Sequence, residues 1–188
     1  MKAGIIPVRI EPRSGAPYLE MRQKDPVFGP VVKDRAAIAT AAGLRPSELD
    51  ARYLVQVVST GVPFAIVPLR GPASLARIDP SDKLLRRLLA PLGAFHPYYL
   101  VTGGGPFEAR MLFHGVEDPA TGSAAGCAVA YLVACGRWPP DVTLVIRQGR
   151  FLRRPSRISA AASLADGRVH NVRVGGHVVE VLQGTLRL

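Results

Sequence analysis

The sequence predicts an α+β protein in which a curved mixed β-sheet, close to a barrel, wraps around one buried central helix. Residues 123–135 carry small or apolar side chains on all sides, which is typical of a helix that packs on every face. Short β-prone runs precede and follow this segment, and glycines and prolines separate them. A chain of 188 residues with 48% hydrophobic residues is long enough to bury a sizeable core.

Before the buried helix, β-prone runs alternate with short helical segments. The first two runs alternate apolar and polar side chains about a turn at 12–15, which predicts a hairpin with one buried face. Prolines and a glycine predict a loop at 25–30. Strands are expected, in chain order, at 4–11, 18–22, 53–59, 64–69, 97–102 and 107–113.

Three helices are expected in the same part of the chain. Asp34 can cap a helix that runs to about Ala42 and ends at Gly43. A second, short helix is expected to begin at Pro46, and Asp79 with Pro80 predicts the start of a third, amphipathic helix that ends near residue 93.

After the buried helix, the pattern returns to short strands. Gly136 is a natural C-terminal stop for the helix. Glycines then separate β-prone segments, which are expected at 142–147, 157–163, 168–174, 177–182 and 185–188.

Charge and composition narrow the possible partners. The net charge is +10, and the segment 147–157 alone holds five arginines, so a basic nucleic-acid-binding module is one alternative. Nucleic-acid modules usually interleave aromatic residues with basic ones, whereas this chain is only 6% aromatic and shows no known module signature. Nucleic acid is therefore the weaker alternative.

The cysteines and the apolar runs bear on the compartment. Cys127 and Cys135 lie eight positions apart in the expected helix, about 12 Å at its rise per residue, so they cannot bond to each other. Two free, buried thiols fit a reducing compartment, and no residue spacing suggests a metal site. No apolar run approaches the roughly 20 residues that span a bilayer. We expect a cytoplasmic protein without a membrane partner.

The candidate site lies where Asp118 precedes the buried helix. The first amides of a helix lack internal partners and lie at the positive end of its dipole. Thr121, Gly122 and Ser123 at this point can therefore hold a carboxylate or phosphate, with the ionisable Asp118 beside it for acid/base chemistry. A simpler alternative makes Asp118 a turn residue and Ser123 an ordinary N-cap.

The motif at 117–124, Glu-Asp-Pro-Ala-Thr-Gly-Ser-Ala, resembles the hallmark of the PhzF-like phenazine-biosynthesis isomerase family, whose fold is diaminopimelate-epimerase-like. In that family two similar lobes face each other, and the substrate lies between the starts of their central helices. The match covers the second lobe only. Supporting motifs occur, in family order, at 3–8, 59–65, 148–149 with 154–156, and 174–186.

The resemblance implies roles for eight residues. Asp118 is the expected proton-handling carboxylate, and Ser123 is a hydroxyl that contacts the substrate. The implied substrate-binding residues are Ser59, Thr60, Gly61, Thr121, Gly122 and Ala124. The implied chemistry is cofactor-independent proton transfer on a small carboxylate-bearing metabolite, with neither cofactor nor metal. Related epimerases use two cysteines, but Thr121 occupies the matching position here, which disfavours two-cysteine racemisation.

The resemblance also implies a domain division. Residues 1–33 resemble the last hairpin of a missing N-terminal lobe, and residues 34–188 resemble the C-terminal lobe, with 185–188 a candidate to return to the missing lobe. The family's catalytic glutamate, in a Ser-Glu-Thr-Thr context, and its Gly-His-Pro-Thr stretch are not found. We expect a second copy, as a homodimer, or a separately encoded lobe to cover the hairpin's apolar face. Without that lobe, a catalytically silent anion-binding or assembly module is the main alternative.

Overall fold

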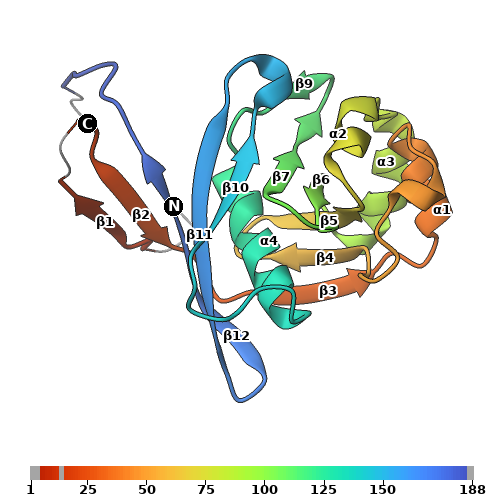
Figure 1. Ribbon diagram of the computed structural model, residues 1–188, viewed down its shortest axis with the longest axis horizontal. Coiled ribbons are helices and arrows are strands. Elements are labelled where there is room, and N and C mark those ends of the chain that lie inside the picture. The colour runs from red at the N-terminus through yellow and green to blue at the C-terminus, as the bar shows by residue number, and fades with distance from the viewer. Residues whose placement is uncertain (1–4, 13–14, 186–188) are drawn as a thin grey trace.

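A ten-stranded mixed sheet forms the framework of the protein, seen in the computed structural model, which describes residues 5–12 and 15–185 (Figure 1). Within these residues the strand order is β1-β2-β12-β11-β10-β7-β6-β5-β4-β3. The strands are β1 (Val8–Glu11), β2 (Tyr18–Arg22), β3 (Val27–Val31), β4 (Gln56–Ser59), β5 (Pro63–Leu69), β6 (His96–Val101), β7 (Phe107–Arg110), β10 (Leu144–Gln148), β11 (Ser156–Ala165) and β12 (Arg168–His177), with a separate pair β8 (Leu112–Phe113) and β9 (Val116–Glu117).

The sheet is mixed because two of its neighbouring pairs, β5 with β6 and β7 with β10, are parallel, whereas the others are antiparallel. The helices are α1 (Arg35–Ala41), η1 (Pro46–Glu48), α2 (Pro72–Arg77), α3 (Asp82–Leu89), η2 (Ala90–Leu92), α4 (Gly122–Ala134) and η3 (Arg150–Leu152). Helices α1 to α3 cover one face of the sheet, and α4 lies within its curve on the other face (Figure 1). No helix among the described residues is long and apolar enough to cross a membrane.

Two hydrophobic cores sandwich the middle of the sheet. Along β5, Phe64 and Ile66 belong to the core around α4, whereas Ala65 and Val67 belong to the core beneath α1 and α3. Successive side chains of a strand point to opposite faces, so a strand covered on both faces must be apolar throughout. This explains why β5 reads as a continuous apolar run.

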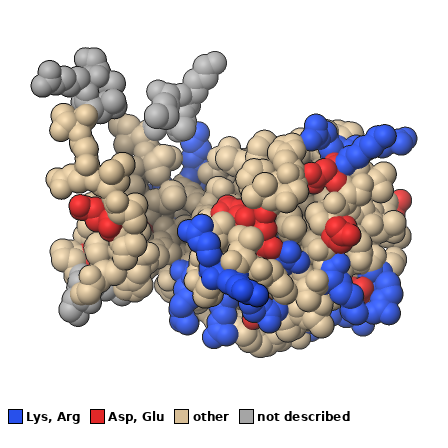
Figure 2. Space-filling view, turned by 90° about the horizontal axis from the view of Figure 1, so that it is seen from above, with Lys and Arg blue, Asp and Glu red and all other residues tan. Residues whose placement is uncertain are grey.

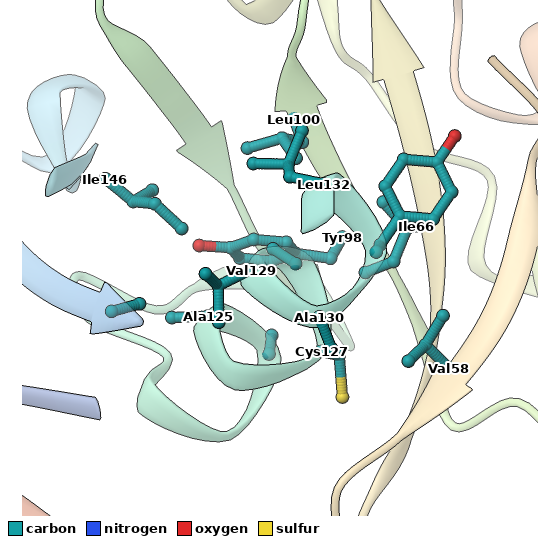
Figure 3. Close-up of a cluster of buried hydrophobic side chains, with 14 of the residues drawn as sticks. Val58, Ile66, Tyr98, Leu100, Ala125, Cys127, Val129, Ala130, Leu132 and Ile146 are labelled. Atoms are coloured by element: carbon teal, nitrogen blue, oxygen red, sulfur yellow. The ribbon is translucent and has the colours of Figure 1, made fainter. Parts of the chain in front are cut away.

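Helix α4 confirms the prediction of a buried central helix. Ten of its thirteen residues are buried, and Tyr98, Leu100 and Ile146 are among the side chains packed around it (Figure 3). Alanine and glycine dominate its faces, which lets the curved sheet approach the helix closely. The predicted α+β arrangement is confirmed.

Several predicted boundaries were wrong. Residues 25–30 are not only loop, because β3 pairs with β4 at the sheet edge, with a register shift between Phe28 and Val31 that accommodates Pro30. The sequence reading missed α2, which is only six residues long. Helix α3 is capped by Ser81 and not by Asp79. Strand β12 runs continuously to His177, and no strand forms at 178–182.

The opening hairpin forms from β1 and β2, but its predicted buried face is not buried by the described residues. Val8 is 53% and Ile10 is 65% exposed. The hairpin joins the rest of the sheet through β2, which pairs with β12. Of the predicted terminal strand, residues 186–188 lie outside the described residues.

Two buried carboxylates, Glu48 and Asp50, should make the stability of the protein sensitive to acid. Burial acts to raise the pKa of Glu48, but hydrogen bonds from Arg45 and Arg77 outweigh it and hold the pKa at about 2. Hydrogen bonds from Arg52, chiefly, hold the pKa of Asp50 at about 2, against burial. Because both pKa values lie below those of the unfolded chain, the stabilisation is complete above about pH 5 and is lost as the pH falls toward 2.

We therefore expect Glu48→Gln to lower the free energy of unfolding by on the order of 2 kcal/mol at pH 7 and by much less at pH 3. Urea unfolding at both pH values measures this difference. Glu180→Gln, which alters a carboxylate in an exposed segment, is the control. An equal effect of Glu48→Gln at both pH values would contradict the prediction.

Candidate active site

Asp118 lies between the end of β9 and the start of α4. Its backbone N–H donates to the Met111 carbonyl at 3.0 Å. Its carboxylate accepts from the Thr121 hydroxyl at 2.8 Å and from the Ala120 N–H at 3.2 Å, and the residue remains partly exposed. Asp118 thus makes the bonds of a turn residue, as the simpler alternative expects, and still presents a carboxylate to solvent.

The start of α4 has no side-chain cap. Thr121, not Ser123, is the N-cap residue, so the alternative that made Ser123 the cap is wrong. The Thr121 hydroxyl donates to Asp118 and caps no backbone N–H of the helix. Gly122, Ser123 and Ala124 form the first turn, where N–H groups have no acceptor inside the helix. The resulting positive end of α4 is suited to an anion.

Gln148 joins Asp118 and Thr121 to the core, although its role was not foreseen from the sequence. Its amide nitrogen donates to the Asp118 carbonyl at 2.7 Å and to the Thr121 hydroxyl at 2.8 Å. Its amide oxygen accepts from the Tyr98 hydroxyl at 2.9 Å. Burial, and to a lesser extent the charge of Asp118, raises the pKa of Tyr98, so Tyr98 is a neutral donor. The Gln148 side chain is therefore fully used within a buried network.

The direction of these hydrogen bonds determines which group donates the proton between Thr121 and Asp118. An amide nitrogen can only donate, so the Thr121 hydroxyl accepts from Gln148. Its own proton is then available for the Asp118 carboxylate. The network holds Asp118 as a hydrogen-bond acceptor.

Gln23 connects the predicted loop 59–61 to the start of α4. The Thr60 hydroxyl donates to the Gln23 side-chain oxygen at 2.6 Å, and the Gln23 nitrogen donates to the Gly122 carbonyl at 3.0 Å. Ser59 accepts from the Gly61 N–H at 3.2 Å within the loop. The structure therefore brings Ser59, Thr60 and Gly61 beside the helix start, through a residue that the sequence reading missed. The sequence feature that could have indicated this contact is Gly126, because a glycine inside a helix often has a packing reason.

Gly126 leaves room for Gln23, because a Cβ at this position would overlap the Gln23 side-chain oxygen. We expect Gly126→Ala to displace Gln23 from Thr60 and Gly122 and to destabilise the protein by about 2 kcal/mol, despite the higher helix propensity of alanine. Gly122→Ala is the matched control, since its Cβ would meet only Val174 at an ordinary 3.7 Å. Urea unfolding of both variants checks the prediction, and equal stabilities would contradict it.

A buried ion pair anchors the strand that leads to Asp118. Arg110 Nη2 lies 2.6 Å from the Glu117 carboxylate, and both side chains are almost fully buried. Arg110 also donates to the Leu75 carbonyl and packs over the Phe151 ring at 4.3 Å. The second carboxylate oxygen of Glu117 is buried without a hydrogen-bond partner among the described residues. The pair ties β9 to β7 directly before Asp118.

The two cysteines differ in environment. Cys127 is buried, its sulfur lies 3.6 Å from the Thr60 hydroxyl, and burial raises the pKa of the thiol more than this contact lowers it. A thiol in that state is a poor nucleophile. Cys135 is exposed, so the prediction that both thiols are buried was wrong for Cys135, which lies at the end of α4. Among the described residues, no group of three His, Cys, Asp or Glu side chains is placed to hold a metal ion.

Sequence comparison identifies relatives across nearly the whole chain. A family model described as "Phenazine biosynthesis-like protein" matches residues 1–184. An uncharacterised isomerase of Bacillus subtilis is 29% identical over 178 residues, covering 89% of this chain and 60% of the relative. The trans-2,3-dihydro-3-hydroxyanthranilate isomerase of Pseudomonas aeruginosa is 28% identical over 187 residues, covering 97% of this chain and 64% of the relative. The chain therefore spans less than two thirds of either relative.

Solved structures share the fold. A predicted epimerase from Pseudomonas aeruginosa superposes with a TM-score of 0.78 at 36% identity, covering 95% of this chain and 64% of that one. A probable proline racemase from Agrobacterium radiobacter superposes with a TM-score of 0.60 at 15% identity, covering 93% of this chain and 55% of that one. The second likeness concerns the fold alone, which is of the epimerase type.

Proposed function

The chain belongs to the phenazine biosynthesis-like (PhzF) family, and from this premise we propose that it forms one lobe of a cofactor-independent isomerase or epimerase. Its substrate is a small carboxylate-bearing metabolite from which a proton is removed and to which one is returned. The observation that carries this proposal is the uncapped start of α4 beside the Asp118 carboxylate. An anion bound by the helix amides would place its neighbouring carbon close to a proton acceptor.

Each residue of the site has a proposed role. Asp118 moves the proton, oriented by Thr121 and, behind it, Gln148. The amides of Gly122, Ser123 and Ala124 hold the substrate's anionic group, and the half-buried Ser123 hydroxyl contacts the substrate. Thr60 is buried and bonded to Gln23, so we assign it to positioning the loop, whereas Ser59 and Gly61 contact the substrate.

A second lobe completes the proposed site. The relatives are longer than this chain, and the family resemblance puts the principal catalytic glutamate in the other lobe. The surface that would meet it is the arm, which we define as β1, β2 and residues 178–185. The arm carries no excess of basic residues, in contrast to the main body, where Lys and Arg cover much of the face shown in Figure 2. Ile10, Val181 and Leu182 on it are 65%, 88% and 87% exposed.

We expect this arm to cause self-association of the isolated chain, since apolar patches of this kind are rarely left uncovered. Light scattering should give at least twice the mass of one chain, and the double variant Ile10→Ser/Val181→Ser should shift the mass toward a monomer. Leu84→Ser/Val142→Ser, which changes exposed apolar residues outside the arm, is the control. A monomeric mass at all concentrations would contradict self-association. A separately encoded lobe would then be the partner that covers the arm.

Deuterium exchange tests the proposed reaction. The protein, alone and together with a family N-terminal lobe, is incubated in D₂O with trans-2,3-dihydro-3-hydroxyanthranilate and with a panel of small carboxylates. NMR then measures deuterium incorporation at carbon. Exchange that needs the second lobe supports the proposal. Carboxylate binding without exchange in either sample would instead favour a catalytically silent binding module on the same fold.

The two thiols give information about the cellular compartment of the protein. Cys127 and Cys135 are both free, and free thiols persist in reducing compartments. They support our proposal of a cytoplasmic location.

A further inference from the structure

A pocket of about 270 Å³ lies on the outer face of the sheet, where β7, β10 and β11 are neighbours. Leu75, Ala109, Phe151 and Pro155 give it an apolar lining. Its charged lining residues are Glu108, Arg147, Arg150 and Arg157. The pocket is thus an apolar hollow whose lining carries three guanidinium groups and one carboxylate.

The pocket faces away from α4. On β10, Ile146 belongs to the α4 core and Gln148 contacts Thr121, so the intervening Arg147 points to the opposite face. On β11, Ile158 belongs to the same core, so Arg157 also points outward. The arginines therefore lie on the face of the sheet opposite the Asp118 site.

Arg147 and Arg157 are directly opposite each other in the antiparallel pair of β10 and β11. Residues in this relation have Cβ atoms about 5 Å apart, and like charges there are unfavourable. The nearest acid in register, Glu108 on β7, forms its ion pair with Arg150 at 3.2 Å. Within the described part of the chain, neither Arg147 nor Arg157 has an ion-pair or hydrogen-bond partner for its side chain. Two guanidinium groups thus face each other at the pocket, and its one lining carboxylate, Glu108, is paired with Arg150.

From this geometry we propose that the pocket binds a small organic anion with an apolar, ring-sized body. Its carboxylate or similar group lies between Arg147 and Arg157 and relieves their repulsion. A planar guanidinium binds carboxylates through two parallel hydrogen bonds, so two arginines suffice for one or two anionic groups. The body of the ligand packs on Leu75 and Pro155.

The occupant is a small molecule and not nucleic acid. The volume of the pocket fits a single ring and is slightly below that of typical ligand cavities. Arg110 and Arg150 are 4.3 and 4.7 Å from the centre of the Phe151 ring, so that ring is already engaged and is not free to stack on a base.

NMR titration of the full chain tests the proposal with three probes: benzoate, inorganic phosphate and the neutral benzyl alcohol. Benzoate should shift the amide signals of Ala109 and Phe151 saturably, and phosphate and benzyl alcohol should bind at least tenfold more weakly. The variant Arg147→Gln/Arg157→Gln should lower benzoate affinity about tenfold or more, because charged hydrogen bonds are lost. Lys83→Gln/Arg87→Gln removes the same charge from exposed positions of α3 and should change little.

Site-resolved signals separate this proposal from the proposed enzymatic site. Benzoate shifts confined to Gly122, Ser123 and Ala124 would support the α4 site and overturn the outer pocket. An equal loss of affinity in the α3 control, or equal binding of phosphate or benzyl alcohol, would also overturn it. So would tighter, steeply salt-dependent binding of a single-stranded RNA at the same amides. Thermal unfolding should show the arginine variant as stable as the native chain, since a like-charge pair is removed.

Discussion

Asp118→Asn is expected to lower the rate of carbon-bound deuterium exchange by about 10²- to 10⁴-fold, the range that positioned acid/base groups contribute. The Thr121 hydroxyl and the Ala120 N–H donate to different oxygens of the Asp118 carboxylate, so asparagine, with one side-chain oxygen, can keep one of these two bonds. The backbone bonds of Asp118 with Met111 and Gln148 remain, so the turn before α4 should be retained. Asparagine cannot take up a proton. NMR detection of exchange in D₂O, with the second lobe present, measures the effect.

Two controls separate chemistry from structure in this experiment. Asp166→Asn changes an exposed carboxylate at a positive-φ turn, where asparagine is well tolerated, and should leave exchange unchanged. Substrate binding by the Asp118 variant should weaken far less than exchange, since the helix amides that hold the anion remain. Unchanged exchange in Asp118→Asn would remove Asp118 from the mechanism.

The fold was largely predictable because its signals are local. The residues of α4 are apolar on every side, and those of β4 and β5 are strongly β-prone, so each segment indicates its own structure. Strand β3 was missed because Gly29 and Pro30 oppose it locally. It exists because β4, some 30 residues later in the chain, offers an edge for pairing. Tertiary context overrides propensity in this case.

The site was less predictable because its supports are distant in sequence. The Glu-Asp-Pro-Ala-Thr-Gly-Ser-Ala motif identified Asp118 and the helix start. The side chains that hold them are Gln148, 30 positions from Asp118, and Gln23, 99 positions from Gly122. A glutamine gives no pattern that distinguishes a buried bridge from a solvated side chain. They are revealed only by the folded chain, in which Gln23, after β2, and Gln148, at the end of β10, both bond to residues at the start of α4.

Gln148→Leu is expected to cause the largest loss of stability, about 3 kcal/mol or more. Leucine fits the buried space but leaves the Tyr98 hydroxyl, the Asp118 carbonyl and Thr121 without their partner. Each buried polar group that loses its partner costs about 1 to 3 kcal/mol. Urea unfolding measures the loss. Gln56→Leu is the matched control, because the side chain of that half-buried glutamine donates, within the part of the chain that the structure describes, a single hydrogen bond, to the Gly29 carbonyl at 3.1 Å.

A double-mutant cycle with Tyr98→Phe tests whether the network acts as a unit. Removing the Tyr98 hydroxyl leaves the Gln148 oxygen with only the weak 3.4 Å contact from the Thr121 N–H. If both changes are made, the Tyr98–Gln148 bond disappears without an orphaned partner, so the double variant should be more stable than the sum of the single losses by about 1 kcal/mol or more. Strict additivity, or a Gln148→Leu loss no larger than that of Gln56→Leu, would contradict the bridging role. If Gln148 has this bridging role, Gln148→Leu should also lower the rate of deuterium exchange, because the Thr121 hydroxyl would be free to turn away from Asp118.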